Sequence, residues 1–129
     1  MSWRLVVFNF DGHPPPDKLN TAFRPRTMGP AGWVRDSISS LLSDVAWSDP
    51  AQGTFDGGEF SMWFRLAAAD GPIDRVEIEV MGDGNPLPVL ALLCQVNGWF
   101  AYDVGERVFL DPDAEKAQGW EAQKQTPKA

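Results

Sequence analysis

Residues 82–111 read GDGNPLPVLALLCQVNGWFAYDVGERVFLD, and this stretch decides the fold. Asp83 or Asn85 can cap a helix whose first position is Pro86, because a short polar side chain satisfies the free N–H groups of a first turn. The residues that follow, up to Asn97, place apolar side chains on nearly all sides of such a helix. They predict a core helix that is buried on more than one side.

The residues after this helix predict a short hairpin. Gly98 stands where a left-handed C-terminal cap belongs, and residues 99–103 and 107–111 form two short apolar runs. Between these runs, Gly105 is expected to supply the positive φ of a tight turn. The whole stretch is therefore expected to have a structural role, as a core helix followed by a hairpin.

The first glycines of the stretch invite comparison with a dinucleotide-binding loop. Gly82 and Gly84 follow a predicted strand and precede a helix, as such a loop requires. However, Leu87 occupies the place of the third glycine, and Asp83 puts a negative charge where a pyrophosphate would bind. No nucleotide cofactor is expected here.

Three regions upstream predict strands or a loop. Residues 3–10 are apolar on both faces and predict a central strand. Residues 60–66 and 76–80 each alternate apolar with polar side chains, so they predict an antiparallel hairpin with one face in water. The register of that hairpin does not follow from the sequence. Residues 11–28 contain three consecutive prolines and predict a long surface loop, which is a secondary candidate for ligand binding.

Residues 30–45 predict the first helix. Its apolar residues recur at three- and four-residue spacing and are Trp33, Val34, Ile38, Leu41, Leu42 and Val45. This spacing predicts an amphipathic helix of about 15 residues with Trp33 on the buried side. Pro50 and the glycines at 53, 57 and 58 predict that turns lead from this helix to the strand at 60–66.

The order of the predicted elements is strand, helix, two hairpin strands, helix and two short strands. It predicts an α+β two-layer sandwich, in which two main helices cover one face of an antiparallel or mixed sheet of four or five strands. A ferredoxin-like arrangement fits this order. Residues 1–121 are expected to form a single domain with a last short helix around Trp120, and residues 122–129 a frayed tail.

The net charge of −7 is concentrated in the middle of the chain. Residues 51–112 contain three arginines and ten acidic residues, whereas the flanking parts are neutral. An acidic surface repels nucleic acids and anionic membranes and steers the protein toward basic partners. It also favours solubility in general.

Few residues point to covalent chemistry. His13, the only histidine, lies in the proline-rich loop, and Cys94 falls on the apolar stripe of the second helix. Neither position favours a nucleophile or a general base. The acidic groups of residues 11–17 and 111–115 lack the spacing of a known metal-binding loop. We therefore expect a protein that is not an enzyme and holds no metal or cofactor, with a hydrolase that uses an unrecognised carboxylate pair as a third option.

The aromatic residues are more informative about function. The chain has six tryptophans, and Trp63 alternates with the buried residues of its own strand. An exposed tryptophan surrounded by carboxylates suits a basic protein partner, because charge steers the encounter and the indole holds the complex. The candidate partner-binding residues are Trp63, Arg65, Glu77, Glu79, Asp56, Glu59, Asp74 and Asp83.

Residues 45–112 also carry a pattern of glycines, prolines and aromatics. It consists of Trp47, Gly53, Phe60-Ser61-Met62-Trp63-Phe64, Gly82-Asp83-Gly84-Asn85-Pro86, Gly98-Trp99, Asp103 and Phe109-Leu110-Asp111. This pattern resembles small uncharacterised bacterial proteins, some of which are encoded near polymorphic toxin systems as immunity proteins. The resemblance implies a cytoplasmic acidic protein that binds and blocks a toxin domain, and it assigns no site residues.

The expected function is therefore a non-enzymatic protein-binding module, namely an immunity protein that neutralises a basic cytoplasmic toxin such as a nuclease. The alternative is a small-ligand-binding or regulatory α+β domain that uses the sheet and the loop up to Met28. The apolar run at 3–10 is too short for a signal peptide or a membrane span. A cytoplasmic location without nucleic-acid or membrane partners is the expectation.

Overall fold

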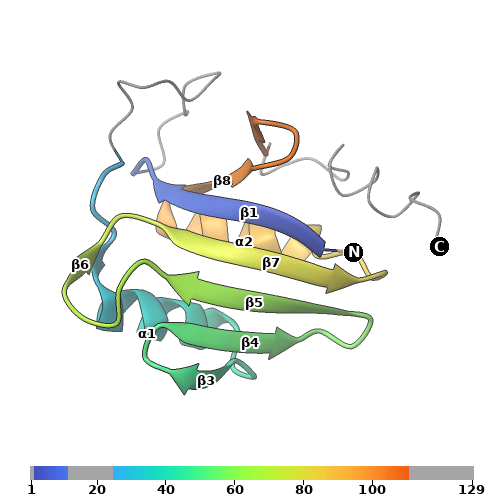
Figure 1. Cartoon of the computed structure of the whole chain (residues 1–129), viewed down its shortest axis with the longest axis horizontal. Coiled ribbons are helices and arrows are strands. Elements are labelled where there is room, and N and C mark those ends of the chain that lie inside the picture. The colour runs from blue at the N-terminus through green and yellow to red at the C-terminus, as the bar shows by residue number, and fades with distance from the viewer. Residues whose placement is uncertain (1, 12–24, 111–129) are drawn as a thin grey trace.

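The computed structural model describes residues 2–11 and 25–110, which form a two-layer α+β fold (Figure 1). Its elements are β1 (Ser2–Asn9), β2 (Gly29–Pro30), α1 (Ala31–Leu41), β3 (Ala46–Asp49), β4 (Gln52–Asp56), β5 (Phe60–Leu66), β6 (Pro72–Ile73), β7 (Val76–Gly82), α2 (Leu87–Asn97), β8 (Trp99–Asp103) and β9 (Val108–Phe109). Within this part of the chain, neither helix is long and apolar enough to cross a membrane.

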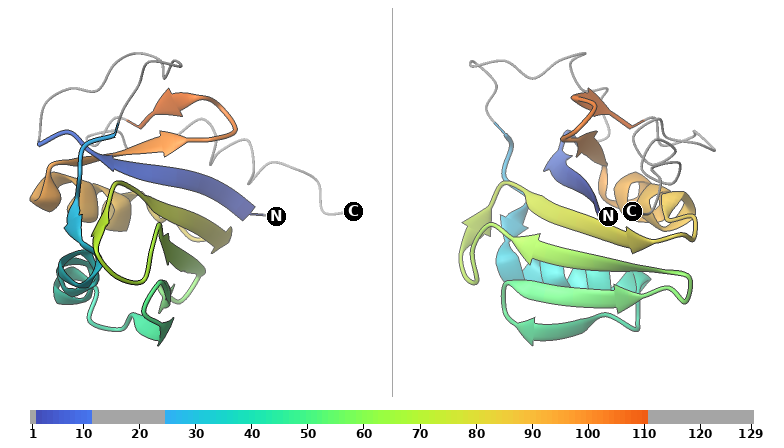
Figure 2. Two further views of the ribbon diagram at one scale, coloured as in Figure 1. Left: turned by 60° about the vertical axis from the view of Figure 1, so that its left-hand side comes forward. Right: turned by 45° about the vertical axis from the view of Figure 1, so that its right-hand side comes forward.

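Seven of the described strands form one antiparallel sheet in the order β3-β4-β5-β7-β1-β8-β9, and β2 pairs with β6 beside it. Both helices lie on the same face of the large sheet (Figure 2). The predicted α+β class with two main helices is confirmed, but the sheet is larger than the predicted four or five strands. The expected helix around Trp120, the tail at 122–129 and positions 12–24 of the predicted loop lie outside the described residues.

The centre of the sheet agrees with the sequence pattern. β1 lies between β7 and β8, as its two apolar faces predicted. β5 and β7 form the predicted antiparallel pair, and the register now places Trp63 opposite Glu79 and Arg65 opposite Glu77. The alternate residues of these three strands, including Leu5, Phe64 and Ile78, are buried against the helices. This layer is the main core.

The second helix begins and ends where its signals stand. The side-chain oxygen of Asn85 accepts a hydrogen bond from the Leu87 N–H at 3.1 Å, and Gly98 adopts a left-handed φ of 70° after the last turn. The expectation of burial on more than one side is wrong, because Leu92 and Val96 are 43% and 61% exposed. The described helices form a single layer, so the outer side of α2 faces away from the core.

The first helix is shorter than predicted, and its tryptophan points outward. α1 spans 11 residues and buries Ala31, Val34 and Ile38, whereas Trp33 is 71% exposed. Adjacent positions on a helix lie about 100° apart, so Trp33 lies well away from the buried side of α1 that Val34 marks. Val34 and Ile38 are four residues apart, and their stripe is the one that packs against the sheet.

The sequence interpretation missed the β3-β4 hairpin, because three glycines and a proline indicated turns there. Gly53 is a strand residue: it pairs with Trp47, and a Cβ at this position would come within 2.7 Å of the Trp47 ring. The indole N–H of Trp47 donates a hydrogen bond to the hydroxyl of Ser39 at 2.9 Å. Because residue 53 has no side chain, the Trp47 ring can pack directly against β4. The hydrogen bond from Trp47 to Ser39 then connects β3, at the edge of the sheet, to α1.

The hairpin of β8 and β9 forms as predicted, but its turn works differently. The positive φ belongs to Arg107, at 59°, and not to Gly105. One carboxylate oxygen of Asp103 accepts hydrogen bonds from the N–H groups of Gly105 and Glu106 at 3.0 and 3.1 Å. The other oxygen accepts one from the indole of Trp3 at 2.9 Å. Asp103 is only 1% exposed, so it organises the turn and adds little to the acidic surface.

Candidate functional site

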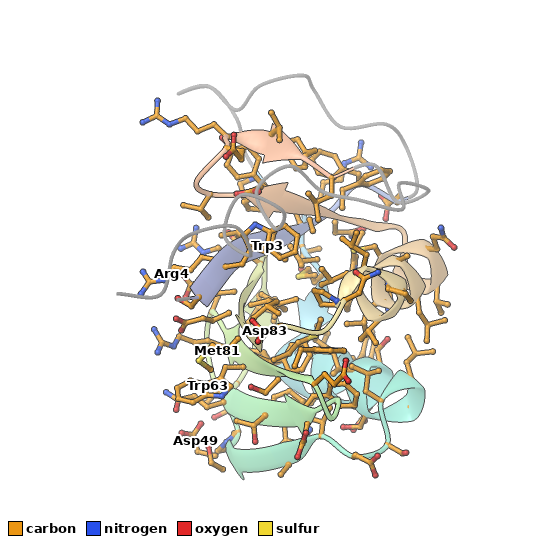
Figure 3. All side chains as sticks on the ribbon, turned by 90° about the vertical axis from the view of Figure 1, so that its right-hand side faces the viewer. Trp3, Arg4, Asp49, Trp63, Met81 and Asp83 are labelled. Carbon is orange, nitrogen blue, oxygen red and sulfur yellow. The ribbon has the colours of Figure 1, made fainter. Side chains whose placement is uncertain are left out.

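The face of the large sheet that points away from the helices, which we call the open face, holds half of the predicted site residues. Arg4 and Trp63 project from it on the side opposite to α1 and α2 (Figure 3). Strand alternation brings Arg65, Glu77 and Glu79 to the same face. Four of the predicted residues are therefore neighbours on adjacent strands.

The register arranges these side chains in two rows across the strands. One row runs from Thr54 through Trp63 and Glu79 to Arg4, and the next from Gln52 through Arg65 and Glu77 to Val6. The Nε atom of Arg4 lies 3.9 Å from a carboxylate oxygen of Glu79, at an exposed and long contact that holds the two groups only weakly. Within the described residues, Glu77 and Arg65 form no ion pair.

A hollow of about 420 Å³ lies over these two rows. Its lining includes Arg4, Gln52, Trp63, Arg65, Glu77 and Glu79. Trp63 is 51% exposed, so much of its indole surface is available to a partner. The hollow combines an aromatic surface with two carboxylates and two guanidinium groups.

Aromatic rings cover the part of the open face next to the hollow. Ring centroids lie 5.0 to 6.4 Å apart in the edge-on contacts of this cluster, whose members are Phe8, Phe10, Phe100, Tyr102 and Phe109. Such contacts stabilise the short β9 strand against β8 and the end of β1. The hollow thus lies mainly over β4, β5, β7 and the first half of β1, with Ser48 and Val104 at its border.

Three of the predicted acids gather at one end of the sheet, which faces the viewer in Figure 3. The N–H of Asp83 donates to the carbonyl oxygen of Glu59 at 3.1 Å, and Asp56 begins the same β4-β5 turn. Asp44 joins them around a second hollow of about 470 Å³ that is lined by Asp44, Asp56 and Glu59. We call these four residues the acidic end. The sequence did not single out Asp44, because it belongs to the neutral first part of the chain.

Asp74 does not belong to this group. It precedes Val76, whose partner Leu66 lies at the far end of the β5-β7 pair, whereas Glu59 and Asp83 flank the opposite end. The predicted set therefore divides into the hollow, the acidic end and an isolated Asp74.

Cys94 is buried, and the described residues hold no candidate metal centre. Burial raises the pKa of the Cys94 thiol to about 12, although a backbone hydrogen bond at Ala101 opposes this shift, so the thiol stays protonated at neutral pH. Residues 2–11 and 25–110 hold no group of three side chains that could bind a metal ion. His13 and the acids at 113 and 115 lie outside the described residues.

No protein-family profile matches this chain, and no curated protein matches it in sequence.

Proposed function

We propose that this protein is a non-enzymatic binding module whose open face holds a basic protein partner, and that it serves as an immunity protein against a basic cytoplasmic toxin such as a nuclease. The observation that carries the proposal is the half-exposed Trp63 in a hollow that also contains Glu77 and Glu79.

The chemistry of the hollow suits a cationic side chain. An indole face attracts an ammonium or guanidinium group through its quadrupole, by about 0.5 to 2 kcal/mol. Glu77 stands two residues from Glu79 on the same face and lacks an ion-pair partner within the described residues, so its carboxylate is available to the same cation. A lysine or arginine of the partner can thus stack on Trp63 and pair with Glu77.

The acidic end supports the choice of a basic partner. Its acidic side chains lie at the end of the sheet next to the hollow, since Thr54 lines both hollows. Charges at the rim of an interface mainly raise the association rate, while a buried aromatic anchor slows dissociation. The two regions therefore have separate roles in the proposed complex.

We also propose a ferredoxin-like core for this module. The strand order β5-β7-β1-β8, its antiparallel pairing and the two helices on one face support this arrangement. β3 and β4 extend this core at one edge and β9 at the other.

A small-ligand-binding role is the second candidate, because the hollow of about 420 Å³ falls in the range of small-molecule sites. A metabolite that raises the melting temperature of the wild-type protein, but not of Trp63→Ala, would favour this role. The lining of the hollow contains two carboxylates and two guanidinium groups, which suits the side chains of a protein partner better.

Co-expression with the product of the adjacent gene tests the proposed function. If that product is toxic to a bacterial host, the wild-type protein is expected to restore growth, and Trp63→Ala is expected to restore it less at equal protein levels. Growth arrest that the wild-type protein does not relieve, together with no complex between the two purified proteins, would contradict the proposal.

The acidic end gives a kinetic prediction for the same complex. Neutralising it with Asp56→Asn, Glu59→Gln and Asp83→Asn is expected to lower the association rate constant about tenfold at low salt and to weaken its salt dependence. Asn at 56 keeps the oxygen that accepts the Gly58 N–H, so the turn is preserved. Stopped-flow measurements check this, with Asp74→Asn at the far end of the sheet as the matched control. An equal change in both variants would show that the acidic end does not steer the partner.

A further inference from the structure

The hollow on the open face contains as many positive as negative side chains. Its charged lining consists of Arg4, Arg65, Glu77 and Glu79. It differs in this from the second hollow at the acidic end, whose charged lining residues are all acids. A partner that is selected only for its positive charge would therefore meet two guanidinium groups in the hollow.

Arg4 has a counter-charge within the protein. Its Nε atom lies 3.9 Å from a carboxylate oxygen of Glu79. The Arg4 side chain is also 73% exposed at the start of β1, so its guanidinium group can turn toward water when the hollow is covered. Arg4 therefore does not require an anion from the partner.

Arg65 lacks such a counter-charge. It lies directly opposite Glu77, but no ion pair joins the two side chains in the described part of the chain. Its neighbour on the other side of the same row is Gln52, which is uncharged. Asp49 lies one strand further out, and its carboxylate accepts a hydrogen bond from the Ala51 N–H at 2.7 Å. Arg65 is thus an exposed arginine of the hollow without an ion-pair partner among the described residues.

A bound partner changes the balance of charges around Arg65. In the proposed function, Glu77 pairs with a cation of the partner that stacks on Trp63. The same contact covers Arg65, because Arg65 lies beside Trp63 on β5 and opposite Glu77. A charge that loses its water without gaining a counter-charge opposes binding strongly. A partner that takes Glu77 for its own cation therefore needs an anion for Arg65.

We propose that the hollow recognises a pair of opposite charges on the partner: a lysine or arginine that binds Trp63 and Glu77, and a carboxylate beside it that binds Arg65. This inference rests on the proposed function of the open face and specifies the partner segment that the hollow takes. A guanidinium group suits a carboxylate, because two of its N–H groups can donate in parallel to the two oxygens. Residues two apart on one face of an extended segment are about 7 Å apart, which matches the spacing of Trp63 and Arg65 on β5.

The sign of a charge-removing substitution tests the proposal. Arg65→Gln and Arg75→Gln each remove one positive charge, and Arg75 is exposed but does not line the hollow. If net charge alone governed binding, both variants would bind a basic partner at least as tightly as the wild type. We expect instead that Arg65→Gln raises the dissociation rate constant at least about tenfold without lowering the association rate constant. Arg75→Gln is expected to leave the dissociation rate constant unchanged.

Surface plasmon resonance with the purified product of the adjacent gene measures both rate constants on the full chain. Arg65→Lys keeps the charge but not the two parallel donors, so its dissociation rate constant is expected to lie between those of the wild type and Arg65→Gln. Thermal unfolding checks that all variants remain folded. A dissociation rate constant that Arg65→Gln leaves unchanged or lowers, in a complex that Trp63→Ala weakens, would overturn the charge-pair proposal and leave the proposed function standing. A complex that neither variant weakens, or the absence of any complex, would overturn both.

Discussion

Asp103→Ala is expected to lower the free energy of unfolding by about 3 to 5 kcal/mol, a large part of the stability of a small domain. The Asp103 carboxylate is buried and accepts three hydrogen bonds, from the Trp3 indole and from the N–H groups of Gly105 and Glu106. Alanine would leave the buried indole N–H without this acceptor and release the turn between β8 and β9.

The three donors to Asp103 differ in burial, and this difference determines how much each lost hydrogen bond contributes to the destabilisation. Gly105 and Glu106 are exposed, so their N–H groups can bond to water after the substitution, whereas Trp3 is 4% exposed. The contact between Asp103 and Trp3 also joins the start of β1 to the end of β8, which are 100 residues apart in sequence. We therefore expect the indole bond to carry a measurable share of the loss.

Urea unfolding of a double-mutant cycle with Trp3→Phe measures this share. Asp103→Ala should cost at least about 1 kcal/mol less in the Trp3→Phe background than in the wild type. Glu106→Ala, which changes an exposed side chain in the same turn, is the control and should change stability by less than about 0.5 kcal/mol. Equal costs of Asp103→Ala in both backgrounds would show that the turn alone explains the effect.

The parts of the fold that follow from local rules could be predicted from the sequence. Alternation along β5 and β7 identified both strands and the face on which Trp63 lies. Gly98 marked the end of α2, because a left-handed cap depends on that residue alone. The apolar run of β1 identified a central strand, although Arg4 on its first half is exposed on the open face.

The parts that depend on contacts distant in sequence could not be predicted. Gly53 is a strand residue only because Trp47 lies against it, and Asp103 is structural only because Trp3 reaches it. The outward position of Trp33 depends on which of two adjacent apolar residues the sheet accepts.

The candidate site shows the same division. The placement of Trp63, Glu77 and Glu79 on one face follows from the period of two in a strand. Their arrangement in rows could be known only from the strand register in the structure. The grouping of Asp44 with Glu59 could be known only from the way the β4-β5 turn packs. Spacing along the chain holds no information on such distances.

Trp63→Ala is the second change with a large expected effect. Removal of a half-exposed indole from the centre of an interface costs about 2 to 4 kcal/mol of binding free energy, which is a rise in dissociation constant of about 30-fold to 1,000-fold. The effect on folding should stay below about 1 kcal/mol, because the side chain is 51% exposed and lies on the face away from the core.

The matched control is Trp33→Ala. Trp33 is even more exposed than Trp63, at 71% against 51%, but lies on the helix layer on the other side of the molecule. Both variants remove one exposed tryptophan, so a general loss of solubility or of apolar surface would affect them alike. Only a role of the open face predicts a difference between them.

Titration calorimetry of the purified partner against the wild-type protein, Trp63→Ala and Trp33→Ala is therefore the most direct measurement of partner binding at the open face. The predicted result is a dissociation constant that rises at least 30-fold, by the same estimate as above, for Trp63→Ala and stays at the wild-type value for Trp33→Ala. A dissociation constant that Trp63→Ala leaves unchanged, in a variant that unfolds at the wild-type temperature, would contradict the assignment of the open face as the binding surface.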